Sequence, residues 1–257
     1  MIEVRRIVSA ESRLFLKLIC DVFDLDISRA DSVFYSEPFY DINRKWGVFE
    51  DGRMVSGLTT VPLEFGFGHG FGIAGVATHP SARGRGLAQR LVETVCADGV
   101  ERGEGFAYLF AQNPTMYERA GFRVLDEVIR GPFEAVTTAE DSDLLSFDEV
   151  EKLYGAWASA HPARLVRDER RWKFWKWNLR MCCSVPGGYV CQEGDLVREA
   201  VFDHHLVEWP IFERAEWLGL RSLTESLGVP LRSSETELML MACGTDVVPQ
   251  MFMTDQF

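Results

Sequence analysis

The sequence lacks several features that would place it in a special class of protein. No apolar run among its 257 residues approaches the roughly 18 residues of a membrane span. The opening residues, Met1 to Arg6, lack the long apolar stretch of a secretory signal. Positive charge is also scarce, and a formal net charge of −12 opposes binding to nucleic acid or to anionic membranes. We therefore expect neither nucleic acid nor a membrane as a partner.

The six cysteines form no CxxC pair and no regular framework. We expect reduced, mostly buried thiols in a cytoplasmic protein, with a redox-active Cys182–Cys183 pair as the alternative. The histidines His161, His204 and His205 have no cysteine or carboxylate at metal-ligand spacing, so we predict no metal.

The order of apolar patterns predicts a mixed α/β fold. Strands come first, followed by strand–helix–strand–helix–strand up to residue 136, with a glycine-rich flexible connection over residues 66–72. Leu87, Leu91, Val92 and Val95 predict a helix over residues 84–102. The polar segment 137–143 suggests a boundary, which gives domains 1–136 and 137–257. The second domain is expected to contain helices over residues 168–179 and 213–227, among others.

One loop between a strand and a helix is rich in glycine and arginine. It runs from Gly75 to Gln89 and contains the run Arg83-Gly84-Arg85-Gly86. Free backbone N–H groups at a helix N-terminus and two glycines that allow close approach favour a pyrophosphate ligand. The loop matches neither GxxxxGK(S/T) nor GxGxxG. An ordinary glycine-rich turn with solvated arginines is the alternative.

A second element, from Asn113 to Phe122, opens a short helix after the next strand. Parallel neighbouring strands place it beside the first loop. Tyr117 within it is a phenol, whose ordinary pKa of about 10 suits protonation of a departing thiolate. A tyrosine at the edge of the core is the alternative.

Together these two elements resemble the GNAT superfamily of acyl-CoA N-acyltransferases. Arg83 to Ala88 matches the family's Q/R-x-x-G-x-G/A coenzyme A loop, and Tyr117 to Phe122 matches its Y-x-x-x-G-F element. The resemblance covers roughly residues 1–136. It implies that acetyl-CoA or another acyl-CoA is the co-substrate and that Tyr117 is the general acid. The implied coenzyme-binding residues are Val76, Ala77, Thr78, Arg83, Gly84, Arg85, Gly86, Leu87, Ala88, Gln89, Gln112 and Asn113.

A finer resemblance is to the enhanced-intracellular-survival type of acetyltransferase, which carries a second, degenerate GNAT-like half. Gly75-Val-Ala-x-x-Pro-x-x-Arg83 and the segment from Arg167 to Trp175 carry this likeness. We therefore expect a tandem architecture with an acceptor groove between the halves. Those enzymes add a third domain, which 257 residues cannot hold. Their use of a terminal carboxylate as base thus transfers poorly to Phe257.

The expected function is transfer of an acetyl group to an amine of a small molecule or peptide. Glu64, His79 and the Phe257 carboxylate are the candidate bases, because the strand from Ile73 to Thr78 carries no glutamate. A longer acyl chain and a non-catalytic acyl-CoA sensor are the alternatives. The aromatic residues Phe34, Tyr35, Phe39 and Tyr40 are expected either to line an acceptor pocket or to pack ordinarily. The basic, aromatic run 170–180 is expected to pack through Trp172, Trp175 and Leu179 on one helical face.

Overall fold

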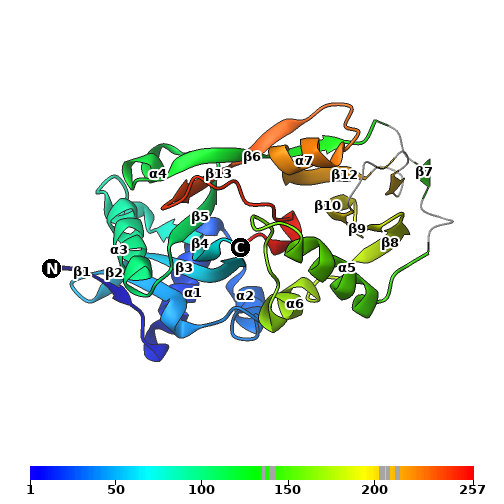
Figure 1. The fold of residues 1–257 in the computed structure, drawn as a ribbon. Coiled ribbons are helices and arrows are strands. Elements are labelled where there is room, and N and C mark those ends of the chain that lie inside the picture. The colour runs from blue at the N-terminus through cyan, green and yellow to red at the C-terminus, as the bar shows by residue number, and fades with distance from the viewer. Residues whose placement is uncertain (135–136, 139–142, 203–205, 207–208, 212–214) are drawn as a thin grey trace.

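The computed structural model describes residues 1–134, 137–138, 143–202, 206, 209–211 and 215–257. A mixed sheet of eleven strands runs through both halves of the chain, with helices packed against it, as Figure 1 shows. Its strand order is β1-β2-β3-β4-β5-β13-β6-β12-β10-β9-β8. The mixed α/β class expected from the sequence is confirmed.

The strands of the large sheet are β1 (Ile2–Arg6), β2 (Lys45–Glu50), β3 (Arg53–Phe65), β4 (Gly68–Thr78), β5 (Phe106–Ala111), β6 (Arg123–Pro132), β8 (Met181–Val185), β9 (Gly188–Glu193), β10 (Leu196–Val201), β12 (Glu216–Leu220) and β13 (Glu235–Cys243). Two short strands, β7 (Thr137–Thr138) and β11 (Pro210–Ile211), pair with each other. The α-helices are α1 (Ser12–Phe23), α2 (Ile27–Phe34), α3 (Leu87–Glu101), α4 (Thr115–Arg119), α5 (Phe147–Ser159), α6 (Glu169–Trp175) and α7 (Arg221–Leu227).

Two helices sandwich the first half of the sheet. The apolar stripe of α3 is buried as predicted and packs with Trp46 and Val48 of β2. The alternate residues of β2 face the other way, where Phe49 packs with Phe15 of α1. This period-two alternation gives β2 two buried faces, which explains why Lys45–Glu50 contains no exposed residue.

The glycines at residues 68–72 do not form the flexible connection that we expected. They belong to β4, and two of them make room for aromatic rings. A Cβ added at Gly70 would lie 2.4 Å from the Phe106 ring, and one added at Gly72 would lie 2.4 Å from the Phe257 ring. Tertiary packing, rather than backbone freedom, therefore accounts for these two glycines.

Two expectations for the second half are also corrected. Residues 216–220 of the expected helix 213–227 form β12, and the helix α7 begins only at Arg221. Residues 213–214 lie outside the described part. Helix α6 ends at Trp175, so Leu179 is 91% exposed and does not share the buried face of Trp172 and Trp175.

The last strand of the chain lies inside the sheet of the first half. Strand β13 pairs antiparallel with β5 on one side and with β6 on the other. Strand β6 in turn pairs antiparallel with β12 of the second half. Figure 1 shows β6 bridging the two halves. The boundary at residue 136 stays a prediction, but the sheet itself continues across it.

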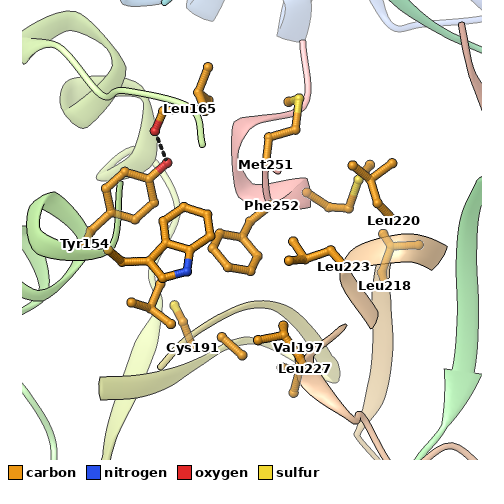
Figure 2. Close-up of a cluster of buried hydrophobic side chains, with 14 of the residues drawn as sticks. Tyr154, Leu165, Cys191, Val197, Leu218, Leu220, Leu223, Leu227, Met251 and Phe252 are labelled. Atoms are coloured by element: carbon orange, nitrogen blue, oxygen red, sulfur yellow. Dashed lines mark hydrogen bonds between the residues drawn. The ribbon is translucent and has the colours of Figure 1, made fainter. Parts of the chain in front are cut away.

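The segment after β13 is anchored in the core of the second half. Figure 2 shows Met251 and Phe252 among buried side chains from α5, β10, β12 and α7, where the Tyr154 hydroxyl donates to the Leu165 carbonyl at 2.8 Å. Next to them, Arg167 is fully buried and pairs with Asp255 at 2.7 Å and with Glu199 at 2.6 Å. The tail is thus held by both apolar packing and buried ion pairs.

All six cysteines are free thiols, and Cys20, Cys182, Cys183 and Cys191 are buried. No helix in the described ranges is long and apolar enough to cross a membrane.

Candidate functional site

Strand β4 separates from its parallel neighbour before either strand ends. Its pairing with β5 stops at Ile73 opposite Leu109, although β4 continues to Thr78. On its other side, Gly75 and Val76 together oppose the single residue Leu58 of β3, which is a β-bulge. Gly75 adopts a φ of 59°, a value that favours glycine. The end of the pairing leaves the side of residues 74–78 that would face β5 without that strand as a partner, and the bulge bends the strand at the same place.

The arginine- and glycine-rich loop lines a cavity of about 270 Å³, which we call the α3 cavity. Gly86 precedes α3 with a φ of 70° and contributes no side-chain cap. The first N–H groups of α3 are therefore free of intrahelical partners and of a cap. A Cβ added at Gly84 or Gly86 would meet nothing within 4 Å, so the space over the loop is open. These features fit a diphosphate group.

The remaining loop residues divide between the cavity and its surroundings. Arg83, Leu87, Ala88 and Gln89 line the α3 cavity, and the Arg83 Nε atom donates to the Thr78 carbonyl at 3.2 Å. Arg85 does not line the cavity; it donates to Glu50 at 2.9 Å. Met116 and Arg119 of α4 also line the cavity. We did not predict these two, although their spacing around Tyr117 on a short helix could have indicated them.

The predicted strand residues occupy different places. Thr78 lines the α3 cavity, while Ala77 is buried and its carbonyl accepts from the Ser56 hydroxyl at 2.7 Å. Val76 lies in the bulge. Gln112 and Asn113 follow β5 and are exposed, and the Asn113 Oδ1 atom accepts from the backbone of Thr115 at 3.0 Å. Neither lines the α3 cavity.

Tyr117 lies on α4 between Met116 and Arg119 but does not itself line the α3 cavity. Its ring packs edge-on against Phe122, with the ring centroids 6.4 Å apart. The ring is half-buried beside the core that includes α3. Burial raises the pKa of the Tyr117 hydroxyl above its ordinary value of 10.0. The phenol therefore holds its proton at neutral pH, as a proton donor must.

A second cavity of about 230 Å³, which we call the α1 cavity, lies against the same strand. Its wall includes Phe34, Phe39, Ala74, Gly75 and Phe257. Two of the four aromatic residues proposed for an acceptor pocket thus line it. Of the other two, Tyr35 is 46% exposed and Tyr40 is half-buried.

The three candidate bases lie in three places. Phe257 lines the α1 cavity. Glu64 lines another cavity of about 230 Å³ with His69 and Glu104. His79 borders neither the α1 nor the α3 cavity, and its Nδ1 atom lies 2.7 Å from the Ser81 hydroxyl. The structure thus brings together Phe257 and the bulge, but not Glu64 or His79.

The α1 cavity also contains ionisable residues that the sequence analysis missed. Lys45 is only 2% exposed, and Glu37 is half-buried. Burial lowers the pKa of the Lys45 ammonium and raises that of the Glu37 carboxyl. The signal available was weak: a lysine at the start of a strand that otherwise reads as buried on both faces.

Among the described residues, no cluster of three or more His, Cys, Asp or Glu side chains is arranged to hold a metal ion. His204 and His205 lie outside the described residues. The absence of a metal stays a prediction.

Comparison with known proteins agrees with this geometry. Residues 3–125 match the model of the acetyltransferase (GNAT) domain. An uncharacterised N-acetyltransferase of Streptomyces griseus is 29% identical over 195 residues, which are 67% of this chain and 47% of the relative. The chain therefore spans about half the length of the curated relatives it matches.

Two solved structures share the fold across nearly the whole chain. A GCN5-related N-acetyltransferase from Kribbella flavida has a TM-score of 0.72 and 18% identity, covering 94% of this chain and 70% of that one. Eis1 from Mycobacterium abscessus has a TM-score of 0.64 and 17% identity, covering 93% of this chain and 73% of that one. The likeness is therefore one of fold, and it extends through both halves.

Proposed function

We propose that the protein transfers an acetyl group from acetyl-CoA to an amine, because residues 3–125 match the model of the acetyltransferase (GNAT) domain. One observation carries the proposal: the α1 and α3 cavities adjoin the same stretch of β4. Gly75 lines the first and Thr78 lines the second. Three residues of extended chain span about 10 Å, so two substrates can meet across this segment.

The residues of the α3 cavity suit the diphosphate part of coenzyme A. The free N–H groups at the start of α3 and the Arg83 side chain supply positive potential. Gly84 and Gly86 allow the ligand to approach the backbone. Acetyl-CoA supplies the acyl group in activated form, as a thioester.

The reaction replaces a C–S bond by a C–N bond. The acceptor amine attacks the thioester carbonyl and loses one proton, and the departing sulfur gains one. Tyr117 holds the proton that the sulfur takes. In this proposal a backbone N–H of the β4 bulge, near Ala77, stabilises the negative charge that develops on the carbonyl oxygen. A binding site for both substrates adds to the rate through proximity.

Substitution of Tyr117 tests the chemical step. We expect Tyr117→Phe to lower kcat by about 10²- to 10⁴-fold, because the proton donor is lost. Acetyl-CoA binding, measured by calorimetry, should be unchanged. Tyr35→Phe is the control, because Tyr35 is exposed and lies outside α4, the helix whose Met116 and Arg119 line the α3 cavity, and it should retain full activity. Unchanged turnover in Tyr117→Phe would rule out the general-acid role. Tight acetyl-CoA binding without acetylation of any amine would instead identify a sensor.

A further inference from the structure

The α1 cavity has an apolar wall interrupted by a few polar side chains. Five phenylalanines line it: Phe15, Phe34, Phe39, Phe174 and Phe257. The ionisable groups come from separate segments: Glu37 follows α2, Lys45 begins β2, and Arg171 lies on α6. The volume of about 230 Å³ suits a compact molecule rather than a long one.

Lys45 is a buried cation that no carboxylate contacts. Its Nζ atom makes one long hydrogen bond of 3.4 Å, to the Thr59 hydroxyl directly across the strand pair. Otherwise it faces aromatic rings, with the Phe34 centroid at 4.8 Å and the Tyr40 centroid at 5.2 Å. No ion pair to Lys45 occurs in the part of the chain that the structure describes.

Two other buried cationic side chains, Arg167 and Arg171, contact hydrogen-bond acceptors of the protein itself. Arg167 meets two carboxylates within 2.7 Å. Arg171 donates to the backbone carbonyls of Pro62 at 2.8 Å and Asp255 at 3.2 Å. Burial of an unpaired charge is costly, so such a group is usually paired. The ammonium of Lys45, which no carboxylate of the described residues contacts, can therefore accept an anionic ligand.

Glu37 provides the opposite charge on the same wall. Its carboxyl attracts Lys45 through space without bonding to it. A cavity with an ammonium, a carboxylate and an aromatic lining is complementary to a small zwitterion with an apolar body. Gly75 of the bulge also borders this cavity, which places such a ligand beside the segment proposed for acyl transfer.

We propose that the acceptor is an amine that also carries a carboxylate, an amino-acid-like molecule with an apolar side chain, and that Lys45 binds the carboxylate. This inference rests on the proposed function. Lys45 is then a specificity-determining residue of the acceptor site, and Glu37 attracts the amino end of the acceptor.

Matched pairs of acceptors test the inference. Phenylalanine is compared with 2-phenylethylamine and leucine with 3-methylbutylamine, because each pair differs only by the carboxylate. Thiol release gives kcat/KM, and calorimetry in the presence of coenzyme A gives the affinity of each compound. We expect the carboxylate member to be favoured about 10- to 100-fold, as a hydrogen bond between charged groups implies. In Lys45→Met this preference should fall to about one.

Lys17→Met is the control variant, because Lys17 is exposed on α1 and pairs with Asp21 outside the cavity. It should keep the preference. Lys45→Gln provides a second variant if Lys45→Met folds poorly. Equal use of both members by the unmodified protein, or a preference that survives in Lys45→Met, would overturn the inference while leaving acetyl transfer intact. If acetyl-CoA does not bind, the proposed function fails, and calorimetry of the amino acids still decides the role of Lys45.

Discussion

Cys96 on α3 and Cys243 at the end of β13 both pack against the core of the first half, and a hydrogen bond between their thiols changes the pKa of each. This bond, assisted by the nearby Arg123 guanidinium, lowers the pKa of Cys243 to about 6. The same bond and burial raise the pKa of Cys96. At neutral pH we therefore assign the thiolate to Cys243 and the shared proton to Cys96.

Alkylation measures this pair directly. We expect the rate of iodoacetamide modification at Cys243, followed by site-resolved mass spectrometry, to rise with pH and to reach half its maximum near pH 6. An ordinary thiol would do so near its usual pKa of about 8.5. In Cys96→Ala the hydrogen bond is lost, so the midpoint should move upward. A midpoint above 8 in the unmodified protein would refute the assignment.

At this scale the sequence located the loop of one of the two cavities, and the coenzyme-binding role of that loop stays a prediction. Arg83, Gly84 and Gly86 could be assigned because a loop that precedes a helix has a local signature. Lys45 and Glu37 could not, because their importance depends on a cavity built from α1, β3, β4 and the chain end. Arg85 matches the motif equally well, yet it pairs with Glu50, a residue 35 positions away. No local pattern reports such a partner.

At the scale of elements, two glycines have opposite roles. Gly131 on β6 lies so close to the next segment that an added Cβ would be 1.9 Å from the Ser233 carbonyl oxygen. Gly155 lies on the exposed face of α5, where an added Cβ would meet nothing within 4 Å. Gly131 is therefore required for close backbone packing, whereas Gly155 only lowers the stability of its helix.

Alanine substitution should separate these roles. We expect Gly131→Ala to lower the free energy of unfolding by about 1–3 kcal/mol, because the backbone must move apart. The matched control, Gly155→Ala, should raise it by about 0.5–1 kcal/mol, because alanine is the better helix former. Urea unfolding of both variants measures the two changes. A neutral Gly131→Ala would mean that β6 and the segment around Ser233 are not packed as described.

Helices whose apolar residues recur with a clear period could be predicted from the sequence. Segments whose apolar pattern fits both a helix and a strand could not. The stripe of α3 has the 3.6-residue spacing of a helix, and its prediction is confirmed. In contrast, β12 runs directly into α7 without an intervening glycine or proline, so one apolar segment appeared to be a single helix. The glycines of β4 misled for another reason, because distant rings rather than a turn require them.

At the scale of the molecule, β13 from the second half is inserted between β5 and β6. This insertion decides whether the first half can fold without the second. Residues 1–136 contain β5 and β6 but not the strand that joins them. Unpaired strand edges promote aggregation. We therefore expect the fragment 1–136 to aggregate or to lack a cooperative melting transition, whereas the 257-residue chain melts cooperatively.

Expression of the fragment with and without residues 137–257 in the same cells checks this. Co-expression should restore solubility, because the second fragment supplies β13. A monomeric fragment 1–136 that melts cooperatively by itself would contradict the expectation. The pairing of β13 with β5 and β6 was not predictable from the sequence, because the apolar pattern of residues 235–243 does not indicate which strands it pairs with.

The position of β13 also affects how the chain folds while the ribosome synthesises it. Strand β6 ends at Pro132, and β13 does not begin until Glu235. At a synthesis rate of about 5–20 residues per second, roughly 5 to 20 seconds pass between them. During that interval β5, the strand next to the proposed acyl-transfer segment, lacks its neighbouring strand β13. Chains released early are thus left with an unfinished sheet in the first half, although they contain every residue of the arginine- and glycine-rich loop.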